Sequence, residues 1–175
     1  GNYILRLNDN NINWSGFINC ISGAVSIEST ASLRSKILSV MSGWSNNFSA
    51  SVSNYYIGGL EGDGIYNTSK AFYIGHYDPQ YPDQDFYGEL RGNYTMTKVG
   101  DNTQIFSFPN SVRSASVVVS EGVLELQDAE ALGQTRVKVS SSYASPIFRL
   151  NNVYSFPYII DVFPSGAIEN YNTSY

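Results

Sequence analysis

Charged side chains are scarce in this chain. Asp, Glu, Lys and Arg make up 14% of its 175 residues, against about 25% in an average globular protein. Ten Lys and Arg residues face fifteen Asp and Glu, which leaves a net charge of −5, and the basic residues do not cluster. Such a surface repels phosphate, so nucleic acid is excluded as a partner. No apolar run approaches the roughly 18 residues of a membrane-spanning helix, so we expect no membrane insertion by this chain.

Cysteine and histidine are also nearly absent, with only Cys20 and His76 present. A lone cysteine cannot form an intrachain disulfide, and we expect Cys20 to be a buried, unreactive strand thiol. Structural zinc takes four ligands such as Cys and His, and a cysteine nucleophile would need a base that only His76 could supply. No serine-hydrolase, phosphate-loop or zinc-peptidase motif occurs. The sequence therefore predicts no enzyme, no metal and no cofactor.

Hydroxyl and amide side chains supply the polarity that charge does not. The chain has 25 Ser, 17 Asn and 14 Tyr, and 42% of its residues are apolar. Enough apolar surface is available to fill a core, which excludes a disordered chain. The length predicts one domain over residues 1–175. Because the chain starts at Gly1 without Met, we expect this domain to be taken from a longer surface protein.

Most segments are predicted to be short strands separated by turns. Turn signals recur every 8–12 residues, which is typical of an antiparallel β-sandwich or barrel. The segments Tyr94–Val99 and Gln104–Phe108 flank Gly100-Asp101-Asn102 and are expected to form a β-hairpin. No internal repeat is evident. The predicted fold class is mainly β, an antiparallel β-sandwich or barrel-like sheet.

One amphipathic helix is expected within this β structure, over about residues 30–42. Leu33, Ile37, Val40 and Met41 recur at helical spacing on one face. Ser29 or Thr30 could cap its start, and Gly43 follows as a stop signal. We expect this helix to cover one end or one face of the sheet.

The stretch Phe72–Tyr87 is the most unusual segment, because it is dense in tyrosine and phenylalanine and holds the only histidine and three aspartates. Aromatic faces beside hydrogen-bonding groups suit sugars, and a loop held by a rigid β scaffold is a usual place for them. A structural loop packed on the sheet, Ca²⁺ held by the carboxylates and a glycosidase pair are alternatives. The candidate glycan-binding residues are Tyr73, His76, Tyr77, Tyr81, Asp83, Asp85 and Arg91, of which Arg91 could anchor an acidic or hydroxyl-rich sugar.

Segments near both ends of the chain resemble a known family. The chain opens with the aromatic-apolar stretch Asn2–Leu7 and a polar loop, and it closes with Phe156–Pro164 and the tail Glu169–Asn172. These segments, the chain length and the Asn- and Ser-rich, Lys-poor composition resemble the head domain of the rotavirus outer-capsid spike protein, which trypsin releases. The middle of the chain, including the expected helix, does not match. The resemblance implies a galectin-like β-sandwich that contacts host glycans.

The predicted function is host-cell attachment by a non-enzymatic domain on the virion surface, in the outer capsid. The expected partners are a host-cell glycan or receptor and the remainder of the spike protein. Two alternatives stay open: a structural or assembly component of a capsid, tail or pilus, and a small glycan-active enzyme. An exposed hydrophobic edge strand would favour assembly, whereas a deep cleft with two facing carboxylates would favour the enzyme.

Overall fold

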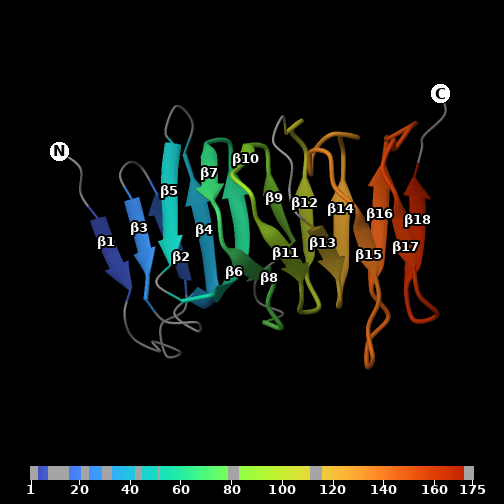
Figure 1. The fold of residues 1–175 in the computed structure, drawn as a ribbon, viewed down its shortest axis with the longest axis horizontal. Helices are drawn as coiled ribbons and strands as arrows, with labels where there is room; N and C mark the ends of the chain where they lie inside the picture. The colour runs from blue at the N-terminus through green and yellow to red at the C-terminus, as the bar shows by residue number, and fades with distance from the viewer. Residues whose placement is uncertain are drawn as a thin grey trace.

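The chain winds into a parallel β-solenoid. The computed structural model describes residues 4–7, 16–20, 24–28, 33–41, 45–50, 52–78, 83–110 and 116–171. Within these ranges every regular element is a β-strand, and every strand pair is parallel. The strands lie side by side along one long axis, from β1 at one end to β17 and β18 at the other (Figure 1). The same part of the chain contains no helix that could cross a membrane.

The strands form three ladders, which we name A, B and C. Ladder A contains β1 (Ile4–Leu7), β3 (Ala24–Ile27), β5 (Ser45–Ala50), β7 (Ile65–Thr68) and β10 (Glu89–Arg91). Ladder B contains β2 (Gly16–Cys20), β4 (Leu33–Val40), β6 (Asn54–Gly62), β9 (Gln84–Phe86), β12 (Thr103–Phe106), β14 (Val123–Leu126), β16 (Ile147–Asn151) and β18 (Ala167–Tyr171). Ladder C contains the first half of β6, then β8 (Ala71–Ile74), β11 (Thr95–Lys98), β13 (Ser116–Val119), β15 (Val137–Val139) and β17 (Ile160–Val162).

The hydrogen-bond register reveals a repeat that the sequence conceals. On ladder B, Gln104 pairs with Gln84 and with Leu124, 20 residues away in each direction, whereas Leu124 pairs with Phe148, 24 residues further on. One coil is therefore about 20 residues, but loops of different length change the period. The expectation of no internal repeat is wrong for this reason, since each coil keeps its strands and varies its connections.

Inward-facing side chains stack in rows along the axis to form the core. On ladder C, Phe72, Met96, Val117 and Val137 pair in register and are all buried. On ladder B the equivalent row contains Phe86, Phe106, Leu126 and Leu150. Each of these side chains packs on its equivalents in the coils before and after it, so stability comes from contacts between neighbouring coils.

The structure contradicts the predicted antiparallel sandwich or barrel. Strands β11 and β12 flank Gly100 as expected, yet they do not pair with each other. Strand β11 pairs with β8 and β13 on ladder C, and β12 pairs with β9 and β14 on ladder B. The turn between them redirects the chain to the next ladder instead of reversing it. A glycine turn between two strand-like segments is compatible with both outcomes, which is why the hairpin prediction is wrong.

The expected helix over residues 30–42 is also wrong, because its centre is the strand β4. Leu38 and Val40 occupy alternate positions and are fully buried, whereas Met41, assigned to the buried helical face, is 47% exposed. Ile37 and Val40 are β-branched, which favours a strand. Apolar residues on both faces of a buried strand can mimic the spacing of an amphipathic helix, and pairing with β2 and β6 decides the conformation.

Candidate binding grooves at the corners of the solenoid

Three of the predicted glycan-binding residues lie where ladder C ends or just beyond it. Tyr73 faces outward from β8, and its ring stacks on that of Tyr56 with centroids 4.4 Å apart. His76 is buried, with its Nε2 atom 3.1 Å from Oε1 of Gln84. Tyr77 is exposed, and its hydroxyl donates a hydrogen bond to the Glu121 carboxylate. Of these three, Tyr77 presents the most ring surface to a ligand.

The other predicted residues lie elsewhere on the coil. A carboxylate oxygen of Asp83 accepts from the Thr103 amide at 2.8 Å, and Asp85 accepts from the Ser107 hydroxyl at 2.8 Å. Arg91 is on ladder A, where it donates to Glu89 at 2.6 Å. Tyr81 lies outside the described residues. The described candidates are thus distributed over all three ladders and the corners between them, and they do not form one cluster.

Glycines build the turn from ladder C to ladder B, which we call the C–B corner. Gly75, Gly100 and Gly122 occupy this turn in successive coils with φ of 131°, 75° and 61°. A Cβ atom on Gly100 would lie 2.3 Å from the carbonyl oxygen of His76. Side chains other than glycine rarely adopt such φ values, and the close approach adds a steric reason. The corner backbone is therefore tightly packed from one coil to the next.

Lys98 lies inside this corner, fully buried. Its ammonium donates to the carbonyl oxygens of Val99 at 2.7 Å and Gly100 at 3.0 Å, and to the side-chain oxygen of Asn102 at 3.2 Å. Loss of solvation lowers the pKa of Lys98 to about 7, and the carboxylate of Glu121 opposes this shift. A single side chain thus satisfies carbonyl groups that the turn leaves without strand partners.

Amide side chains complete the interior of the corner. Gln104 donates to the carbonyl of Leu60 at 2.9 Å and accepts from its amide at 3.0 Å. Asn102 donates to Oε1 of Gln84 at 2.9 Å and accepts from the His76 amide at 3.0 Å. Buried networks in which each member has a partner are rigid, so the C–B corner is a firm support for the loops outside it.

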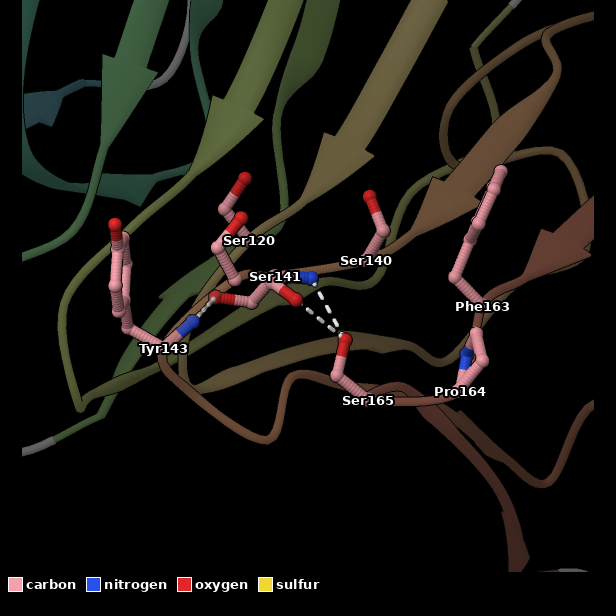
Figure 2. A pocket seen from close by; sticks show the side chains of 8 residues that line it. Ser120, Ser140, Ser141, Tyr143, Phe163, Pro164 and Ser165 are labelled. Carbon is pink, nitrogen blue, oxygen red and sulfur yellow. Dashed lines mark hydrogen bonds between the residues drawn. The ribbon is translucent and has the colours of Figure 1, made fainter.

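A groove opens on the outside of the C–B corner, at the turns that follow β13, β15 and β17. Its volume is about 540 Å³, and five of its eight lining residues are serines. Figure 2 shows Tyr143 at one end, Phe163 and Pro164 at the other, and serine hydroxyls between them. We call this the serine groove; its lining is Ser120, Ser140, Ser141, Ser142, Tyr143, Phe163, Pro164 and Ser165.

Hydrogen bonds lock the two loops that form the serine groove. The hydroxyl of Ser165 donates to the carbonyl of Ser141 at 2.7 Å and accepts from the Ser141 amide at 3.0 Å (Figure 2). The hydroxyl of Ser141 accepts from the amides of Tyr143 at 3.2 Å and Ala144 at 3.0 Å. These bonds fix the backbone that presents Tyr143, whose side chain is fully exposed. Sequence analysis missed this site, because its lining comes from three loops that lie far apart in the sequence.

A smaller cavity lies at the turn from ladder B to ladder A, the B–A corner. It measures about 280 Å³ and combines exposed aromatic rings with carboxylates; its lining is Asp63, Gly64, Ile65, Tyr87, Gly88, Glu89 and Phe108. A hydrogen bond to Asp85 raises the pKa of the Tyr87 phenol. Of these lining residues, only Tyr87 belongs to the stretch Phe72–Tyr87 that the sequence singled out. The Glu89 carboxylate is already paired with Arg91.

The chemistry of the serine groove suits binding. Its lining residues include no carboxylate, histidine or cysteine, and a serine nucleophile needs a neighbouring base. Hydroxyl groups both donate and accept hydrogen bonds. Among the described residues, no group of three or more His, Cys, Asp or Glu side chains is arranged to hold a metal ion.

The structure defines the fold class as a parallel β-solenoid, and comparison with known proteins adds no family to it. No protein-family model matches the chain. Neither the curated proteins nor the solved structures give a match.

Proposed function

We propose that this protein is a non-enzymatic attachment protein that binds a glycan in the serine groove. The observation that carries the proposal is a rigid groove in which serine hydroxyls lie between an exposed tyrosine and an exposed phenylalanine. Sugar rings present C–H patches that pack on aromatic faces and hydroxyl groups that pair with serine. The hydrogen bonds between and within the two loops already order the backbone that carries these rings, so the loops lose little entropy on binding.

The shape of the groove agrees with weak, repeated binding. An open groove holds a sugar less tightly than an enclosed pocket does, so we expect a dissociation constant near millimolar, about −4 kcal/mol. Many copies on one surface would raise the overall affinity by avidity. We therefore propose display on the outside of a virus particle or cell, with a host glycan as the partner.

The proposal does not depend on the resemblance to the rotavirus spike head. That resemblance implied an antiparallel β-sandwich, whereas the described strands pair in parallel. The supporting evidence is the groove itself, in which serine hydroxyls lie between two aromatic side chains.

A glycan array on the purified chain tests the proposal. We expect binding to a defined set of glycans and loss of at least about tenfold in affinity when Tyr143 is replaced by Ala. Tyr154→Ala is the matched control, because Tyr154 is 75% exposed and does not line the groove. No glycan bound, or equal loss in both variants, would contradict the proposal.

Assembly is a second candidate function, favoured by the exposed ends of ladders B and C. Val162 pairs with Val139 and Ile168 pairs with Phe148 on inward rows. Val162 and Ile168 are 44% and 45% exposed, whereas Val139 and Phe148 are fully buried. Uncovered apolar positions at the edge of parallel strands can accept a further strand.

Sedimentation velocity over a range of concentrations separates the two functions. Assembly predicts concentration-dependent polymers that Ile168→Asp abolishes. A monomer at every concentration would rule out assembly by this chain alone and leave the attachment proposal unchanged.

A further inference from the structure

We infer that the serine groove is one part of a longer site, which binds a linear neutral oligosaccharide lying along the solenoid axis on the C–B corner. The inference rests on the proposed function and adds the kind of glycan and its orientation. Its basis is the position of Tyr77 relative to the groove.

Tyr77 leans along the axis toward the serine groove. Its residue belongs to the Gly75 turn, yet its hydroxyl reaches the carboxylate of Glu121, two turns further along the corner. The Gly100 amide of the intervening turn donates to the same carboxylate oxygen at 2.8 Å. The tyrosine side chain therefore spans the middle turn and is fixed at its far end, with 58% of its surface exposed.

Glu121 connects this ring to the serine groove. It follows Ser120, which lines the groove, so Tyr77, Glu121 and Ser120 lie next to one another in sequence or by direct contact. Tyr143 and Phe163 lie at opposite ends of the groove, with Ser120 between them (Figure 2). The corner thus carries three exposed aromatic rings in different coils, with hydroxyl and carboxylate oxygens between them.

The spacing of the coils favours a linear polymer. Neighbouring strands in a sheet are about 4.8 Å apart, so successive turns of the corner follow one another at that interval along the axis. A linear oligosaccharide also repeats one ring at a time, and successive rings can meet successive coils. A single terminal sugar would use the serine groove and leave Tyr77 without a role in binding.

The charges along the corner favour a neutral glycan. The exposed carboxylate of Asp101 lies in the middle turn, and Glu121 lies in the next. Carboxylates accept hydrogen bonds from sugar hydroxyls but repel acidic sugars. Lys98 is buried beneath the corner. The exposed Lys138 places its ammonium 4.7 Å from the centroid of the Phe163 ring and covers one face of that ring, so one cation stands against the two carboxylates.

The affinity for glucose oligomers of increasing length tests this inference. We would titrate the chain with the cellobiose-to-cellohexaose and maltose-to-maltohexaose series by calorimetry. In at least one series we expect affinity to rise about tenfold from the disaccharide to the hexasaccharide. Tyr77→Ala should remove that gain and leave disaccharide affinity unchanged, while Tyr77→Phe, which keeps the ring, should retain most of it.

Two controls separate failure of this inference from failure of the proposed function. Tyr87→Ala removes an exposed tyrosine from the B–A corner and should change no affinity, whereas Tyr143→Ala should weaken every length. Affinity that depends on Tyr143 but not on chain length would overturn the linear site and leave glycan binding in place. Absence of binding in both series, or an equal effect of Tyr77→Ala at all lengths, would also overturn it.

Discussion

The interior of the solenoid differs between two neighbouring regions built on the same ladders. Around residues 76–104 the inward positions include Gln84, Lys98 and Gln104, all buried. One coil further on, the paired positions are Val119 for Lys98 and Leu124 for Gln104. The polar side chains are tolerated because each bonds to backbone groups or amides inside the corner. A row position therefore does not by itself require an apolar residue; it requires that every polar atom has a partner.

The largest effect is expected where both regions share an aromatic core. Phe86 and Phe106 pair in register, and their rings pack edge to face with centroids 6.2 Å apart. Phe106 is also paired with Leu126 in the apolar region, so Phe106→Ala leaves a cavity between coils. We expect a loss of about 3–5 kcal/mol in the free energy of unfolding, measured by chemical denaturation. A loss below about 1 kcal/mol would mean that the coils do not stack as described.

The polar region should make stability depend on pH. The pKa of Lys98 is lowered to about 7 in the folded chain, from a usual value of 10.5. Between these values the unfolded chain binds more protons than the folded chain, so the free energy of unfolding should rise with pH, by up to a few kcal/mol. The measurement is best made between pH 7 and about 9.5, because the tyrosines titrate above that range.

The matched variant is Lys98→Met, which keeps the volume but cannot titrate. Denaturation midpoints of this variant should be nearly independent of pH in the same window. It also leaves the Val99 and Gly100 carbonyls without their donor, so its absolute stability is not the readout. If the denaturation midpoint changed with pH by the same amount in both proteins, the pH dependence could not be assigned to Lys98.

Exchange of residues between the two regions sharpens the comparison. Gln104→Leu should cost about 1–3 kcal/mol, because it leaves the amide and carbonyl of Leu60 without their partner. Leu124→Gln should cost at least as much, since an amide would enter a position where the apolar region offers no matching groups. Thermal melts of both variants would check this, and a stabilised Leu124→Gln variant would show that the two regions are not different.

The smallest effect is expected on the outer surface of ladder B. Arg149 bridges Glu169 at 2.9 Å and Glu125 at 3.2 Å across three coils. Glu125 is buried, whereas the pair of Arg149 with Glu169 is partly exposed. Glu169→Gln removes only the exposed pair and leaves Arg149 with Glu125, so it should cost about 1 kcal/mol or less. The loss should shrink in high salt; a salt-independent loss would assign the effect to packing of the Glu169 stem instead.

Strand positions could be predicted from the sequence, but strand partners could not. Alternation in Ala71–Ile74 and Val123–Leu126 marks half-buried strands, and both segments are strands in the structure. A parallel ladder here joins residues 17 or more positions apart, and nothing in the alternation states which segments pair. Glycines at 75, 100 and 122 mark turns, yet the same signal serves a hairpin or a solenoid corner.

The candidate site, like the fold, could be predicted from the sequence only where it depends on local residues and not on strand pairing. The sequence pointed to Tyr77 through its local density of aromatic residues, and that residue is exposed at the C–B corner. The serine groove joins loops around residues 120, 141 and 164, which the winding of the chain brings together. Each loop alone reads as an ordinary polar turn, so the groove follows only from the coil register.

The most direct test of the central claim is an amide-resolved NMR titration of the purified chain with a glycan that it binds on an array. We predict shifts at Ser120, at residues 140–143 and at residues 163–165, and none at Tyr87 or Phe108 of the B–A corner. Shifts confined to the B–A corner, or spread evenly over the molecule, would contradict glycan binding in the serine groove.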